Sequence, residues 1–137
     1  MTTAISSQEF QLPIRVYIED TDAGDVVYHS NYLKYLERCR TEFLRSLGHG
    51  KAAIMDDVLL VVYELNVRYL APARLDDEVV ATASIAKLSR AYIIFDQEVR
   101  REGQVLCKAA VKIACVSTQM KPVALPADVV SALQACP

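Results

Sequence analysis

The first half of the chain changes from an alternating to a helical pattern of apolar residues. Residues 14–19 alternate with the period of a half-buried strand. Residues 1–12 show no such pattern and predict a loose N-terminal arm. From about Asn31 the apolar positions fall on one arc of a helix: Tyr32, Leu33, Leu36, Cys39, Phe43, Leu44 and Leu47. Ser30 or Asn31 could cap this helix, and Gly48 suits the left-handed residue after its end.

Four segments rich in Val, Ile, Leu and Tyr follow the helix and read as strands. They span residues 58–69, 78–89, 91–101 and 104–116. Glu102 and Gly103 predict a tight hairpin between the last two strands. A short helix is predicted over residues 51–55, and a final helical turn or two after Pro126.

This order of elements predicts an α+β fold. One long central helix is wrapped by a curved antiparallel sheet of about five strands. At 137 residues, the chain is expected to form a single domain spanning residues 1–137. The loop over residues 21–30 should lie where the N-terminus of the helix meets a strand end. Such a junction is a favourable place for a functional site.

Composition narrows the range of partners. The chain has 15 basic and 17 acidic residues, a net charge of −2, and no run of basic residues, so nucleic acid is not an expected partner. It is 53% apolar with a mean hydropathy of +0.18. A small domain leaves much of its surface exposed, so some of these apolar residues are expected in a subunit interface. We therefore expect a homo-oligomer.

The sequence also suggests a compartment and argues against a metal. The longest apolar run, residues 58–63, is too short to cross a bilayer, and the first residues do not resemble a signal peptide. A cytoplasmic location is predicted. The four cysteines show no CxxC spacing and are expected to be buried, reduced hydrophobes. The two histidines have no metal-ligand spacing, so neither a metal nor another cofactor is predicted.

The segment over residues 17–37 carries the candidate chemistry. It combines two acids, Asp20 and Asp22, a turn at Gly24, and the Tyr28–His29 pair at the start of a helix. A carboxylate beside a helix N-terminus can attack or hydrate an acyl carbonyl while backbone N–H groups polarise that carbonyl. The segment therefore predicts acyl transfer to water.

Two stretches of sequence resemble a known family. They are RVYIEDTDAGDVVYHSNYLKYLERCRTEFL, residues 15–44, and more weakly VRYLAPARLDDEV, residues 67–79. Both are similar to the hotdog-fold acyl-CoA thioesterases of the 4-hydroxybenzoyl-CoA thioesterase type, in the branch associated with the Tol–Pal system. The resemblance covers roughly residues 13–130. It implies a hotdog fold, dimers or dimers of dimers, and hydrolysis of acyl-CoA thioesters.

The resemblance also implies roles for individual residues. Asp22 would be the catalytic carboxylate, acting as nucleophile or general base, and the backbone N–H of His29 would polarise the thioester carbonyl. Some members are thought to use the side chains at Tyr28 and His29 as well. This chain departs from the family at Asp25, where a small residue is common. Asp25 could disfavour the charged form of Asp22 or could point into solvent.

Other residues in the motif and beyond it are also candidates for a functional or a structural role. Asp20 is expected to bond loop amides, whereas Asn31 could be a helix cap or a substrate contact. Arg90 matches a position where related enzymes bind CoA phosphate, although a single surface arginine is often only solvated. Arg40 falls inside the apolar arc of the helix and is expected to form a structural ion pair with a loop acid. Tyr28 could line the acyl pocket or serve only in packing.

Two other functions remain compatible with the sequence. A hotdog hydratase or dehydratase acting on enoyl thioesters could use His29 with Asp22. A non-catalytic protein that binds acyl-CoA or acyl-carrier protein would need the fold and cleft alone. The residues do not indicate the length or aromatic character of the acyl group, or whether its donor is CoA or acyl-carrier protein.

Overall fold

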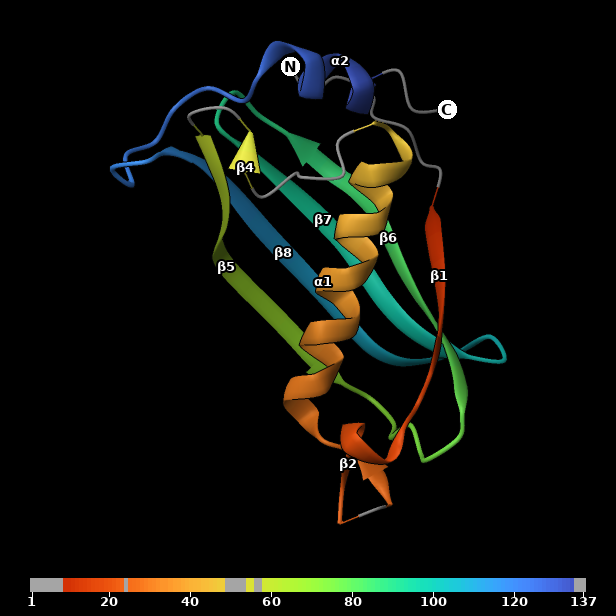
Figure 1. The fold of residues 1–137 in the computed structure, drawn as a ribbon. Coiled ribbons are helices and arrows are strands. Elements are labelled where there is room, and N and C mark those ends of the chain that lie inside the picture. Colours follow the sequence, from red (N-terminus) through yellow and green to blue (C-terminus); the bar gives the residue numbers. More distant parts are fainter. Residues whose placement is uncertain (1–8, 24, 49–53, 56–57, 135–137) are drawn as a thin grey trace.

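The computed structural model describes residues 9–23, 25–48, 54–55 and 58–134, without the side chains of 54–55. Its main feature is an antiparallel sheet that curls around one long helix, α1 (Figure 1). The sheet has the strand order β1-β6-β7-β8-β5-β4. Its strands are β1 (Phe10–Arg15), β4 (Ile54–Met55), β5 (Val58–Tyr69), β6 (Glu78–Leu88), β7 (Tyr92–Arg101) and β8 (Gln104–Ser117). The other elements are a 3-10 turn (Ile18–Asp20), β2 (Thr21–Asp22), β3 (Val26–Val27), α1 (His29–Ser46) and α2 (Ala127–Gln134).

The four predicted strands after the helix are confirmed, each with bounds within one residue of those expected. Glu102 and Gly103 join β7 to β8 and both have positive φ, at 51° and 83°. Two consecutive positive φ values give a turn whose twist matches that of the strands it joins. The α+β fold with a central helix and about five strands is therefore correct, with two-residue β4 as an additional edge strand.

Helix α1 packs its apolar face into the concave side of the sheet. Phe43 lies between Phe10 of β1 and Phe95 of β7, with ring centroids 5.5 and 6.3 Å away. The buried residues of the helix are Asn31, Tyr32, Tyr35, Leu36, Cys39, Phe43 and Leu44. Gly48 follows the helix with φ of 93°, as predicted. No helix among the described residues is long and apolar enough to cross a membrane.

The N-terminal strand lies earlier in the chain than predicted. β1 begins at Phe10, so residues 10–12 belong to the sheet and not to a loose arm, while residues 1–8 lie outside the described ones. β1 pairs with β6 from Phe10 opposite Ala83 to Arg15 opposite Glu78. Its position at the sheet edge tolerates Pro13, which has no N–H to donate. Ile18 lies in the 3-10 turn and is 71% exposed, so it does not continue the strand.

Two helix predictions also need correction. Residues 54–55 form β4, paired with Val58 and Leu59, and not the end of a short helix; residues 51–53 lie outside the described ones. Helix α1 begins at His29, two residues before Asn31. Its N-cap is Tyr28, and neither Ser30 nor Asn31 caps it. The side chain of Asn31 is buried and donates to the Asp20 carbonyl, so this polar residue lies within the helix and not at its cap.

Candidate active site at the N-terminus of helix α1

The N-terminus of α1 is held against the loop that precedes it by the main chain of Asp20. The Asp20 carbonyl accepts hydrogen bonds from the backbone N–H of Tyr28, at 2.9 Å, and from the side-chain amide of Asn31, at 2.8 Å. The Asp20 carboxylate accepts from the N–H of Tyr17 at 3.0 Å. Asp20 is thus a structural centre of the loop, as predicted.

Asp22 lies two residues beyond this centre, on strand β2. Its side chain is exposed, and its residue pairs with Val26 of β3, the strand that leads into α1. The N–H of Asp25 bonds the Asp22 carbonyl at 3.2 Å and closes a turn in which Ala23 has φ of 54°. The predicted turn residue Gly24 lies outside the described residues. The hairpin therefore holds an exposed carboxylate on the loop that is anchored to the helix start.

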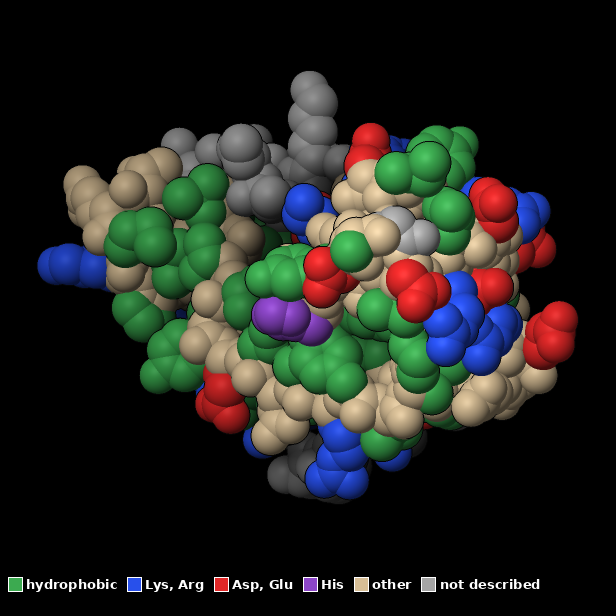
Figure 2. All heavy atoms as spheres, turned by 90° about the horizontal axis from the view of Figure 1, so that it is seen from below, with side chains coloured by type: hydrophobic (Ala, Val, Ile, Leu, Met, Phe, Trp, Pro, Cys, Tyr) green, Lys and Arg blue, Asp and Glu red, His purple; other side chains and the backbone are tan. Residues whose placement is uncertain are grey.

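His29 is the first residue of α1. Among the described residues, no acceptor takes its backbone N–H, and such groups at a helix start carry the positive end of the helix dipole. The His29 and Tyr28 side chains are both exposed, with ring centroids 4.4 Å apart. Figure 2 shows the surface at this end of the molecule, where a histidine side chain lies among apolar and acidic side chains. A helix N–H and a carboxylate on an adjoining loop suit a site that polarises and attacks a carbonyl group.

Asp25 has a cationic partner. Its carboxylate lies 2.9 Å from Nη1 of Arg74, and 74% of its side chain is exposed. The structure thus answers the question that the sequence left open about this residue: the side chain points to solvent and to Arg74.

Tyr32 and Tyr69 line the hollow at the site, with Tyr35 buried behind them in the core, and the sequence did not predict a role for any of the three. The Tyr69 hydroxyl donates a 3.0 Å hydrogen bond to the His29 carbonyl, and its ring lies 5.5 Å from that of Tyr32. The Tyr32 hydroxyl accepts from the N–H of Ala73 at 2.8 Å. Burial, followed by the nearby Asp20 charge, raises the pKa of Tyr35 and keeps this phenol neutral. The spacing of residues 28, 32 and 35 on one helix face was the available sequence signal.

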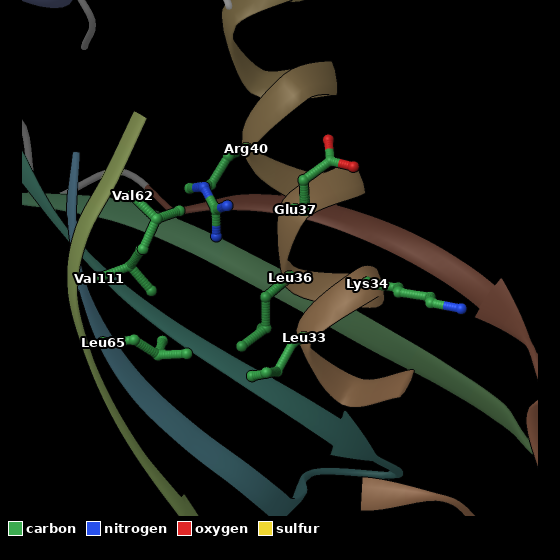
Figure 3. Close-up of a pocket in the computed structure, with 8 residues that line it drawn as sticks. All are labelled: Leu33, Lys34, Leu36, Glu37, Arg40, Val62, Leu65 and Val111. Atoms are coloured by element: carbon green, nitrogen blue, oxygen red, sulfur yellow. The ribbon is translucent and has the colours of Figure 1, made fainter. Parts of the chain in front are cut away.

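Two hollows follow one another between α1 and β5. The first, of about 300 Å³, is lined by Val27, His29, Tyr32, Tyr69, Leu70, Ala71 and Pro72. The second, of about 320 Å³, lies further along the helix and is lined by Leu33, Lys34, Leu36, Glu37, Arg40, Val62, Leu65 and Val111 (Figure 3). We call the two together the α1–β5 groove. It begins at the candidate carbonyl site and is mainly apolar, as an acyl-binding groove should be.

The two arginines that the sequence analysis singled out, Arg40 and Arg90, lie away from the start of α1. The guanidinium of Arg40 bonds Oε1 of Gln97 at 2.9 Å, and no ion pair joins it to an acid among the described residues. The acids Asp56 and Asp57 lie outside those residues, so the expected ion pair with a loop acid stays a prediction. Arg90 lies in the connection from β6 to β7, where its carbonyl accepts from the N–H of Leu125. That connection is at the α2 end of the molecule (Figure 1). It is separated from the N-terminus of α1 by the length of β6, roughly 35 Å.

A long helix wrapped by an antiparallel sheet, with a carboxylate loop at the helix N-terminus, is the architecture of a hotdog-fold thioesterase. The model of the family described as "Thioesterase superfamily" matches residues 24–108. The chain belongs to this superfamily, which confirms the family predicted from residues 15–44.

Individual relatives agree with this assignment. The acyl-CoA thioesterase YbgC of Haemophilus influenzae is 44% identical over 126 residues, covering 90% of this chain and 93% of the relative. A hypothetical protein from Aquifex aeolicus has a solved structure with a TM-score of 0.84 and 33% identity, covering 90% of this chain and 98% of that one. A probable thioesterase from Bartonella henselae has a TM-score of 0.80 and 31% identity, covering 87% of this chain and 100% of that one.

Proposed function

We propose that this protein hydrolyses acyl-CoA thioesters to a free acid and CoA, with Asp22 as the catalytic carboxylate. The observation that carries the proposal is the attachment of the Asp22 loop to the start of α1 through Asp20, Tyr28 and Asn31. This attachment holds the loop that bears Asp22 against the start of α1, where the His29 N–H has no acceptor among the described residues. The YbgC relative from Haemophilus influenzae is an acyl-CoA thioesterase, which supports the same substrate class.

The reaction follows from these two groups. The thioester oxygen accepts a hydrogen bond from the His29 N–H, which stabilises the negative charge that develops on that oxygen. Asp22 either attacks the carbonyl carbon or removes a proton from a water that attacks it. The tetrahedral intermediate then expels CoA as a thiolate, which takes up a proton. If Asp22 is the nucleophile, water hydrolyses the resulting anhydride and restores the carboxylate.

The side chains of His29 and Tyr28 border the reacting carbonyl in this proposal. Both are exposed; His29 lines the first hollow of the α1–β5 groove, and the Tyr28 ring centroid lies 4.4 Å from that of His29, so both can orient the thioester or the attacking water. Asn31 acts by holding the loop, since its amide is bonded to Asp20. Arg90 is separated from His29 by the length of β6 within one chain, so a contact between Arg90 and the CoA phosphates stays a prediction.

We also propose assembly through β5. Its outer edge beyond Leu59 pairs with no other strand among the described residues. This edge carries exposed apolar side chains: Val62 at 53%, Tyr63 at 69% and Leu65 at 39% exposed. A second copy related by a twofold axis could pair its own β5 with this edge, remove the unpaired backbone groups and cover the groove. Association of such dimers in pairs, an acyl-carrier-protein donor and a cytoplasmic location stay predictions.

The test is replacement of Asp22 by Asn, with thiol release measured on a panel of acyl-CoAs. We expect kcat to fall about a hundred- to ten-thousandfold. Asp25→Asn is the matched control, because it removes a carboxylate from the same loop while leaving Asp22 in place; it should retain turnover. Retained activity in Asp22→Asn would overturn the carboxylate mechanism. Loss of enoyl absorbance without thiol release would indicate a hydratase, and tight binding without turnover would indicate a non-catalytic binding protein.

A further inference from the structure

The guanidinium of Arg40 lies inside an otherwise apolar part of the α1–β5 groove. Figure 3 shows it directed toward Val62, on the opposite wall, while the side chains of Lys34 and Glu37 point away from the cavity. Burial lowers the pKa of Arg40, which reflects the loss of water around the cation. A desolvated cation is unfavourable unless a hydrogen-bond acceptor or an opposite charge lies close to it.

Gln97 holds this guanidinium in place. Gln97 is 1% exposed, and its amide nitrogen donates to the carbonyls of Leu36, at 3.0 Å, and Thr82, at 3.2 Å. These two bonds fix the orientation of the amide, so that Oε1 faces Arg40 and accepts from it at 2.9 Å. The position of the cation is therefore set by the folded core and not by a flexible surface contact.

Most of the donors of Arg40 remain available. An arginine has five N–H donors, and one bond to Gln97 is the interaction that the structure gives this side chain among the described residues. Glu37, three residues earlier on the helix, accepts from the hydroxyl of Thr41, and its charge opposes the lowering of the Arg40 pKa without a hydrogen bond to the guanidinium. Because Arg40 lines the second hollow, a ligand there would find a fixed cation beside Val62, Leu65 and the other apolar side chains.

The distance from the carbonyl site limits what that ligand can be. Residues 29 and 40 are separated by about 16 Å along the helix axis. Long side chains on a helix lean back toward its N-terminus, so the guanidinium is closer than this to the carbonyl site. A medium-length acyl chain that starts at the His29 N–H and follows the groove would bring its far end to Arg40.

We propose that Arg40 selects acyl groups that carry an oxygen acceptor at their far end, a carboxylate above all. This inference rests on the proposed thioesterase function and specifies its substrate class. The apolar walls bind the methylene chain, and the charge-assisted hydrogen bond to the terminal oxygen supplies the discrimination. An unsubstituted chain would leave Arg40 with the Gln97 amide as its acceptor and would bury its other donors without one, so it would be disfavoured.

The experiment compares suberoyl-CoA with octanoyl-CoA, which have the same chain length and differ in the terminal carboxylate. We expect the wild-type protein to show a kcat/KM about ten- to a hundredfold higher for suberoyl-CoA. Arg40→Met should abolish this preference by lowering kcat/KM for suberoyl-CoA while leaving octanoyl-CoA equal or better. Arg40→Lys should retain part of the preference. Arg38→Met, an exposed residue on the same helix, removes the same charge and should leave the ratio unchanged.

Two further measurements keep the outcomes distinct. The first is the ratio of dissociation constants for non-hydrolysable thioether analogues of the two substrates. This ratio tests selectivity without turnover, even if the proposed hydrolysis fails. Size-exclusion chromatography and thermal unfolding of Arg40→Met detect a structural role. The inference is overturned if the wild type binds and hydrolyses octanoyl-CoA at least as well as suberoyl-CoA. It is equally overturned if Arg40→Met weakens both substrates alike or changes the oligomeric state.

Discussion

The side-chain amide of Asn31 donates a 2.8 Å hydrogen bond to the main-chain carbonyl of Asp20, eleven residues earlier in the chain. This bond joins the first turn of α1 to the loop that carries Asp22. It shows that the position of the proposed catalytic carboxylate depends on a buried polar contact and not on the hairpin alone.

Asn31→Ala should lower both stability and turnover. Loss of the buried bond to Asp20 should reduce the free energy of unfolding by about 1–2 kcal/mol, measured by urea denaturation. Because the Asp22 loop would be held less firmly, kcat should fall about ten- to a hundredfold. Ser30→Ala is the control: Ser30 does not cap the helix, so its replacement should change stability by less than about 0.5 kcal/mol. Equal effects of the two substitutions would contradict the proposed role of Asn31.

Tyr69→Phe should reduce turnover without unfolding the protein. The Tyr69 hydroxyl bonds the carbonyl of His29, the residue whose N–H is proposed to grip the thioester oxygen. Its loss should lower kcat by about three- to tenfold, with little change in KM for short acyl chains. Tyr63→Phe, on the same strand, removes a hydroxyl from a 69% exposed side chain and should have no effect. A larger effect at Tyr63 than at Tyr69 would argue against this positioning role.

The buried cysteines should be unreactive in the folded protein. Burial raises the pKa of Cys39 to about 12 and that of Cys107 to about 11, so both are neutral thiols at pH 8. Iodoacetamide at pH 8 should therefore label both residues only in denaturant, as measured by peptide mass spectrometry, and should leave hydrolysis intact. Labelling of native Cys39 with loss of activity would contradict this expectation.

The same shifts predict a loss of stability in alkali. Unfolding returns the thiols to their usual pKa of about 8.5. The stabilisation is therefore complete below that pH and is lost as pH rises toward the folded values of about 12 and 11. The urea midpoint should fall over this range.

Asp77 should stabilise the protein at neutral pH and less so in acid. Its carboxylate accepts from the N–H of Arg74 at 2.9 Å and from Arg101 at 2.7 Å. Partial burial alone would raise the pKa of Asp77, but these donors outweigh it and the pKa is lowered. The stabilisation is thus present above the usual pKa of about 3.9 and is lost as pH falls through the lower folded value.

Asp77→Asn tests this expectation by urea denaturation. At pH 7 it should cost about 1–2 kcal/mol, and the difference from wild type should shrink as pH falls below about 4. Asp76→Asn, which changes an exposed neighbour, should cost less. A difference between wild type and Asp77→Asn that does not depend on pH would show that the carboxylate charge is unimportant.

The long elements were predictable because local patterns specify them. Burial alternates over residues 92–100 of β7 and 107–115 of β8, and the turn at Glu102–Gly103 favours the antiparallel arrangement. The helix could be recognised from its apolar arc for the same reason. Short elements offered no such repetition: β4 has two residues, and β1 takes its bounds from its pairing with β6.

The candidate site was likewise predictable only where its residues are close in sequence. The motif over residues 15–44 indicated the family. It also allowed Asp22 and His29 to be predicted as a pair, because the two residues are close in sequence. Tyr69 could not be connected to His29, nor Gln97 to Arg40, since 40 and 57 residues separate the members of each pair. The acceptor that Arg40 has among the described residues is an amide supplied by β7, which the pattern of the helix could not reveal.

The sequence alone determined the class of fold, the central helix, the principal strands and the loop that bears the proposed carboxylate. These features depend on the periodicity of apolar residues and on groups a few positions apart in the chain, and both can be recognised in the sequence without a structure. Only the tertiary structure decided which polar groups hold that loop, where the groove runs and which cation lies within it. Such contacts join residues that are distant in the chain, and they exist only once the sheet has curved around the helix.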